Sequence, residues 1–194
     1  YLEMISQNAS YYQNVQQRIA NNITDDPTNE TNMVLRRQLI KKIQETQNIL
    51  YTDLLIWLYI EEGEYAQAFR QLKALDKRNE NQEAKIISLG QRALAKTQYP
   101  IALESFTYVE SKGEMGAYFE EAIYLKLQTL RLQLRATPQP KKEAFLTLLN
   151  QHYAALKPLQ GDEKYVFTER DIAGILYFDL KISDSATHVL ERTI

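Results

Sequence analysis

The sequence of 194 residues contains no cysteine and only two histidines. Without cysteine, the chain can form no disulfide, no thiolate metal site and no cysteine nucleophile. His152 lies on an apolar helical stripe and His188 near the end of the chain, so we favour core or surface roles for them over metal ligation. His-Glu-x-x-His, phosphate-loop and Gly-x-Ser-x-Gly motifs are missing. We therefore expect no catalytic residue, no metal site and no cofactor, and predict that the protein is not an enzyme.

A dominant charge and a long apolar run are missing as well. The 23 basic and 25 acidic residues nearly cancel, and the net charge of −2 gives no general attraction to nucleic acid or to an anionic membrane. The longest uninterrupted apolar run covers residues 54–60, whereas a membrane-spanning helix needs about 20 apolar residues. We predict no nucleic-acid partner and no direct membrane insertion by this piece of chain.

Glycine and proline are scarce, and between them apolar residues recur at intervals of three and four, the spacing of one helical face. The clearest run is Phe119, Ile123, Leu127, Leu130 and Leu134. No stretch alternates apolar and polar residues with β-branched enrichment, as a strand would. The sequence predicts an all-α fold.

The first 48 residues predict irregular N-terminal helices. One apolar pattern runs from residue 1 to about residue 22, and residues 24–29 form the strongest loop signal of the chain. A second helix is expected from about Thr31, with Leu35, Leu39 and Ile43 on one face. The sequence leaves open whether this helix ends near Gln47 or continues into the next one.

A repeat with a period of 34 residues follows. Five pairs of similar residues are separated by this interval: Leu55 and Leu89, Tyr65 and Tyr99, Ala68 and Ala102, Leu72 and Phe106, and Leu75 and Val109. The alanines mark the closest approach of two helices, and the tyrosines mark the turns. The repeat predicts helical hairpins from residues 49–62 and 65–77, and from residues 83–96 and 99–111.

These positions resemble the tetratricopeptide repeat family. The resemblance is clear over residues 49–112 and partial over residues 167–194. The matching residues are Leu55, Tyr59, Gly63, Tyr65, Ala68, Leu72 and Leu75, then Leu89, Gly90, Ala93, Tyr99, Ala102, Phe106 and Val109, and finally Ala173, Gly174, Tyr177, Ala186 and Leu190. Ile56 replaces the glycine of the family pattern, Gln133 stands where a tyrosine would recur, and neither unit ends in the usual proline.

The resemblance implies an α–α superhelix, a solenoid of about eight helices in a single domain over residues 1–194. After the N-terminal helices, residues 49–116 would form two repeat units, residues 117–160 a long irregular helix pair, and residues 161–194 a partial unit. Pro138 and Pro140 predict either a hinge or a tight turn within the irregular pair. Because the chain begins at Tyr1 and ends within a helical pattern, we interpret it as a piece of a longer protein.

The family binds peptides or partner helices in the groove lined by the first helix of each repeat, which implies a protein-binding scaffold within a larger assembly. The groove positions here are Asp53, Trp57, Ile60, Glu61, Ile87, Gln91, Leu94, Tyr118, Glu121 and Leu125. Trp57 is the strongest candidate for an anchor residue. A tryptophan within residues 54–60 is equally well explained as a core residue.

Four alternatives remain at this point. A basic helix face with Lys126, Arg131 and Arg135 could dock an acidic partner, a phosphate or lipid headgroups, although a solvated face is the favoured interpretation. Thirteen tyrosines and many amides suit a carbohydrate-binding repeat protein. A weak similarity of residues 74–78 to large repeat proteins of the bacterial cell envelope suggests the periplasmic side, with the cytoplasm as the other compartment. RNA recognition by a helical repeat is the third alternative, although the near-neutral charge and the 34-residue period speak against it. Self-association through the last hairpin is the fourth, and the oligomeric state stays open.

Overall fold

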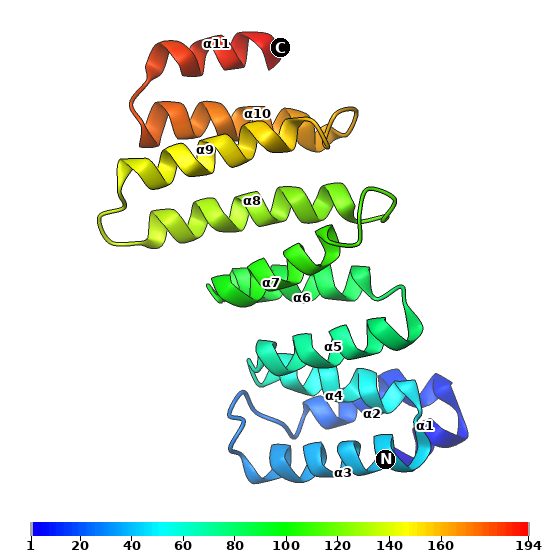
Figure 1. Cartoon of the computed structure of the whole chain (residues 1–194). Helices are drawn as coiled ribbons and strands as arrows, with labels where there is room; N and C mark the ends of the chain where they lie inside the picture. The colour runs from blue at the N-terminus through cyan, green and yellow to red at the C-terminus, as the bar shows by residue number, and fades with distance from the viewer. Residues whose placement is uncertain (1, 194) are drawn as a thin grey trace. The chain divides into compact units, whose positions relative to one another are not determined.

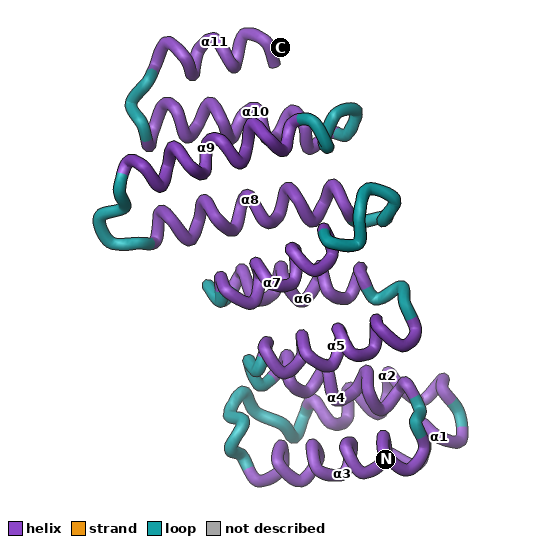
Figure 2. The backbone as a smooth tube through the Cα atoms, viewed as in Figure 1, coloured by secondary structure: helices purple, strands orange, loops and turns teal. Residues whose placement is uncertain are grey.

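The computed structural model describes residues 2–193, and their side chains apart from those of Ser6, Gln7 and Thr193. Helices account for nearly all regular structure, and no strand occurs within residues 2–193 (Figure 2). This confirms the all-α prediction. The α-helices are α1 Leu2–Gln7, α2 Tyr12–Ala20, α3 Glu30–Thr46, α4 Ile49–Glu61, α5 Tyr65–Asn79, α6 Glu83–Ala95, α7 Tyr99–Glu110, α8 Phe119–Ala136, α9 Lys142–Leu156, α10 Glu163–Gly174 and α11 Ser183–Thr193, with a 3-10 helix η1 Ala9–Tyr11 and a π-helix η2 Ile175–Asp179.

The chain divides into two compact units, Tyr1–Gln82 and Glu83–Ile194, called unit 1 and unit 2 below. Within each unit, consecutive helices pack against one another, as in an α–α helical repeat (Figure 1). The hairpin predicted over residues 49–77 is α4 and α5 of unit 1, and that predicted over residues 83–111 is α6 and α7 of unit 2. In the described part of the chain, no helix is long and apolar enough to cross a membrane.

Polar caps set the helix boundaries of unit 1. Gln47 has a left-handed backbone with φ of 52°, which ends α3. The side chain of Asn48 then accepts a hydrogen bond from the Leu50 N–H at 3.0 Å and starts α4. This answers the question that the sequence left open, because α3 and α4 are separate helices. Asn8 likewise caps η1, so the first apolar segment is divided into α1, η1 and α2 rather than forming one helix.

A buried ion pair ties the long loop of unit 1 to its helices. The Arg36 guanidinium donates to the Glu62 carboxylate at 2.7 Å and to the Pro27 carbonyl at 3.1 Å. Asn32, also buried, donates to the carbonyls of Thr24 at 2.8 Å and Asp26 at 3.2 Å. Because the Glu62 side chain is 0% exposed, its charge depends on Arg36 for compensation.

The first hairpin of unit 2 depends on a close approach of α6 to α7. A Cβ atom on Gly90 would lie only 2.6 Å from Cε1 of Phe106 and 3.0 Å from Cβ of Ser105. Ala93 and Ala102 are fully buried in the same hairpin. Small residues at the predicted repeat positions thus allow the two helices to meet, as expected from the sequence.

The remaining helices of unit 2 follow one another as α8, α9, α10 and α11 (Figure 1). Residues 137–141 form the loop between α8 and α9. In the partial repeat, Gly174 faces α8 rather than α11, since a Cβ atom there would lie 2.5 Å from Nη2 of Arg131. Gly174 therefore makes room for a charged side chain, whereas Gly90 makes room for an aromatic ring.

Candidate functional site

The four groove residues expected in unit 1 lie on α4. Trp57 is half-buried and packs against the hydrophobic core of this unit, and its role as a groove anchor stays a prediction. Asp53 and Ile60 are half-buried, and Glu61 is exposed. The local arrangement leaves part of the indole ring accessible.

The other groove residues lie in unit 2. On α6, Ile87 is buried at 5% exposure, Leu94 is half-buried and Gln91 is exposed. Ile87 therefore presents little surface to a ligand. Tyr118 is exposed at the start of α8, where its carbonyl accepts the Ala122 N–H at 2.9 Å. Glu121 and Leu125 follow on the same helix and are half-buried.

The side chains of α8 that face α10 form a continuous series of contacts, which we call the α8–α10 seam. At one end, the Lys164 ammonium lies 3.4 Å from the Glu121 carboxylate. Next, the rings of Tyr124 and Phe167 pack with centroids 6.0 Å apart and an interplanar angle of 46°. The seam consists of Glu121, Tyr124, Gln128, Arg131 and Arg135 of α8, Lys164, Phe167 and Asp171 of α10, and Asp179 of η2.

The centre of the seam is a shared carboxylate. Asp171 accepts hydrogen bonds from Arg131 and from the Gln128 amide, which lies 3.2 Å from the Tyr124 hydroxyl. Burial raises the pKa of Asp171 above its ordinary value, although the charge of Arg131 opposes that shift. Burial also lowers the pKa of Arg131 and raises that of Tyr124. The seam is thus a partly desolvated polar network held in one geometry.

Each residue of the predicted basic face has an acidic partner on a neighbouring element. Arg131 pairs with Asp171, and Arg135 donates two hydrogen bonds to Asp179 at 2.8 and 3.2 Å. Lys126 points to α7 instead, where it lies 2.6 Å from Oε1 of Glu110. The basic residues of α8 therefore carry charges that are largely matched across the helix packing.

His152 is fully buried in α9, with Nδ1 2.8 Å from the Leu148 carbonyl. Its Nε2 atom is buried without a hydrogen-bond partner among the described groups. Burial lowers the pKa of His152 from 6.5 to about 4, and the charge of Arg131 acts in the same direction. The ring is neutral at physiological pH and belongs to the core.

Two adjoining cavities hollow the surface along α8 and α9, with volumes of about 260 and 420 Å³. Gln151 lines both, and Glu110 of α7 completes the smaller one. On α8 the lining residues are Ile123, Lys126, Leu127, Leu130, Gln133 and Leu134, with Thr137 just beyond; on α9 they are Ala144, Thr147, Leu148, Gln151, Ala154 and Ala155, with Pro158 just beyond. We call this surface the α8–α9 groove. Both helices contribute the same spacing of three and four residues, which is one helical face each.

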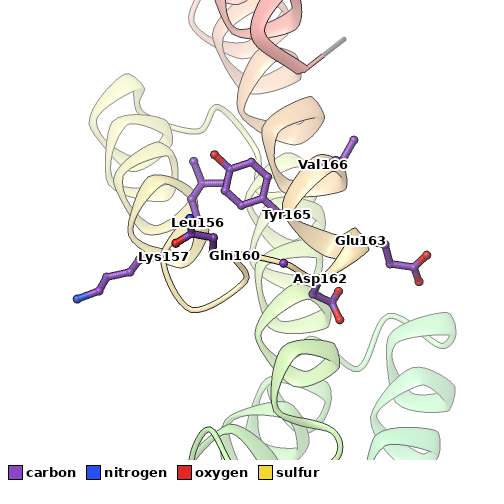
Figure 3. A pocket seen from close by; sticks show the side chains of 8 residues that line it. Leu156, Lys157, Gln160, Asp162, Glu163, Tyr165 and Val166 are labelled. Atoms are coloured by element: carbon purple, nitrogen blue, oxygen red, sulfur yellow. The ribbon is translucent and has the colours of Figure 1, made fainter.

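A wider cavity of about 710 Å³ lies at the turn between α9 and α10. Leu156, Gln160 and Tyr165 lie together beside it, whereas Lys157 and Glu163 point away from them (Figure 3). Asp162 already caps α10 by accepting the Lys164 N–H at 2.8 Å. The polar groups of this cavity do not converge on one point.

The sequence did not predict the residues of α10 and η2 that pair with α8 in the seam, nor the groove between α8 and α9. The α8 residues of the seam are spaced by three, four, three and four positions, so a helical projection of residues 121–135 would have placed Glu121 with Arg131 and Arg135. No comparable signal identifies their partners on α10. Within residues 2–193, no group of three or more His, Asp or Glu side chains could hold a metal ion.

Comparison with known proteins gives no family for this chain. No family model, no curated protein and no solved structure matches it.

Proposed function

We propose that the protein is a non-enzymatic scaffold that binds a protein or peptide segment on the exposed faces of its helices, within a larger assembly. The α8–α10 seam is the observation that carries this proposal. Phe167 is 38% exposed beside Tyr124 and is flanked by two charged pairs, Glu121 with Lys164 and Arg131 with Asp171. Exposed aromatic residues with a fixed polar surrounding are typical of binding hot spots.

Preorganisation supports the same function. Side chains that are already paired lose little conformational freedom when a partner arrives, so more of the contact energy contributes to affinity. The tetratricopeptide-like positions of α4 and α6 agree with this proposal, because the family uses the first helix of each repeat for binding. Trp57 would be the corresponding aromatic contact in unit 1.

Affinity capture from a lysate of the source cells tests the proposal. Wild type is compared with Phe167→Ala and Trp57→Ala, and Met115→Ala serves as the control because Met115 is 99% exposed in a loop. Circular dichroism first establishes that each variant is folded. We expect a protein retained by wild type and Met115→Ala and lost with one of the two aromatic variants. Capture of the same proteins by all four would refute a role for these aromatic residues.

A carbohydrate-binding function has one specific observation in its favour. Tyr177 and Phe178 are 51% and 61% exposed, and their rings pack edge to face with centroids 4.9 Å apart. The π-helix that contains them is a distortion often found at functional sites. Affinity electrophoresis in gels that contain soluble polysaccharides tests whether the pair stacks on sugar rings. If it does, wild type should migrate more slowly in such a gel, and the double variant Tyr177→Ala, Phe178→Ala should be retarded less.

A further inference from the structure

The α8–α9 groove has the form of a docking site for a third helix. Residues 123–137, from α8 to its C-cap residue Thr137, extend over about 21 Å at a rise of 1.5 Å per residue, which matches a partner helix of about 14 residues. Ala144 and Ala154 lie on the α9 side of the groove, and small residues permit a neighbouring helix to approach closely. The floor is aliphatic: Leu130 and Leu134 of α8 are half-buried and present the accessible surface, and Leu127 is buried beneath it.

The charge distribution along the groove defines the occupant more closely. Gln133, Gln151 and Thr147 give an uncharged rim, and Lys126, the one basic lining residue, is neutralised by Glu110. A partner segment must therefore present an uncharged, aliphatic face over most of this length, because a charge placed there would be desolvated without compensation.

The end of the groove at the α8–α9 loop is different. Lys141 and Lys142 stand at the N-cap and the first position of α9, where no side chain caps the helix. Both are exposed, and neither has an acidic partner in the described part of the chain. The positive end of the helix dipole adds to their charge, and Glu143 offsets only part of it. An acidic group is the complement of this end.

We propose that the α8–α9 groove binds an amphipathic helix of a partner protein, with an aliphatic contact face and acidic residues at the end that meets Lys141 and Lys142. This surface is separate from the α8–α10 seam, so the two proposals can fail independently. The complementarity of charge sets the direction of the bound helix, and the aliphatic floor supplies most of the affinity.

Two designed peptides test the proposal by fluorescence anisotropy. Both are fluorescein-labelled helices of about 14 residues with leucines at intervals of three and four, and they differ only in carrying two glutamates or two lysines at one end. Wild type should bind the glutamate peptide at least about fivefold more tightly than the lysine peptide at low ionic strength. Lys141→Glu with Lys142→Glu should reverse this preference, since only the charge at the groove end has changed.

Matched variants separate the groove from general effects. Lys77→Glu with Arg78→Glu changes an exposed basic pair in unit 1 by the same charge and should leave the preference intact. Gln151→Tyr fills the space shared by both cavities and should weaken both peptides about tenfold or more. Phe167→Ala should bind both peptides as wild type does, which distinguishes this site from the seam.

Three outcomes would overturn the inference. The first is that neither peptide binds wild type at concentrations up to about 1 mM, which would mean a Kd weaker than about 1 mM. The second is equal affinity for the two peptides in both wild type and the Lys141→Glu, Lys142→Glu variant. The third is unchanged binding to Gln151→Tyr when circular dichroism shows that this variant is folded.

Discussion

The contact of Gly90 with Phe106 allows a quantitative prediction for Gly90→Ala. The new methyl group would lie 2.6 Å from Cε1 and 2.9 Å from Cζ of the ring, and 3.0 Å from Cβ of Ser105. Phe106 is fully buried, so its ring cannot move out into solvent. The substitution must therefore separate α6 from α7 or displace the ring from its preferred rotamer.

Two opposing terms set the size of the effect. Replacing glycine by alanine inside a helix favours folding by about 1 kcal/mol. Overpacking a filled core costs about 1 to 3 kcal/mol, and the short distances to a buried ring place Gly90→Ala near the upper value. We expect the free energy of unfolding to fall by about 2 kcal/mol.

Urea unfolding followed by far-UV circular dichroism measures this change. Ser88→Ala is the control, because Ser88 is exposed on the same helix and alanine is smaller than serine. The double variant Gly90→Ala, Phe106→Leu should be more stable than the sum of the single changes by about 1 kcal/mol, since the smaller side chain relieves the clash. Fluorescence of Trp57, the only tryptophan, follows unit 1 in the same titration. A Gly90→Ala variant as stable as wild type would refute the close-packing argument.

Three further predictions concern the pH dependence, the buried ion pair and a helix cap. The pKa of His152 is lowered to about 4 in the folded state, so on acidification the unfolded chain binds a proton at about pH 6.5 and the native state does not. The free energy of unfolding should therefore fall by about 3 kcal/mol between pH 6.5 and 4. Urea titrations of His152→Leu should show no such fall from this site. Arg36→Met should lower the free energy of unfolding, measured by heat or urea, by about 3 to 5 kcal/mol, because it leaves the Glu62 carboxylate buried without its partner. Glu62→Gln should lower it less, since the Arg36 side chain is 24% exposed and keeps its hydrogen bond to the Pro27 carbonyl. Equal losses in the two variants would contradict that asymmetry. Asn48→Ala should lower the free energy of unfolding by about 1 kcal/mol, because α4 loses its N-cap. An unchanged urea midpoint would contradict this and show that water replaces the side chain without loss of stability.

The charged and aromatic residues along α8 illustrate how far the site could be anticipated. Glu121 was expected in a binding groove, and Arg131 and Arg135 on a basic face, yet all three lie on one stripe that meets α10 and η2. The periodicity of α8 contains this stripe, but it does not show that acidic residues of α10 and η2 stand opposite. Lys126 differs from its two basic neighbours because its position on the helix directs it to Glu110 of α7.

The local structure of this protein can be predicted from its sequence. The helices of both predicted hairpins begin and end within two residues of the observed bounds, because apolar spacing and turn residues act over a few neighbouring positions. The small residues at the repeat positions also indicated where α6 and α7 approach each other.

Which side chains are available for function depends instead on how the helices pack. Arg131 and Asp171 are 40 residues apart, and Arg36 and Glu62 are 26 apart, yet each pair shares a hydrogen bond. Likewise, the neutral state of His152 depends on the burial that surrounding helices impose. Helical periodicity defines the face on which a residue lies, whereas charge pairing, burial and the groove between α8 and α9 depend on what packs against that face.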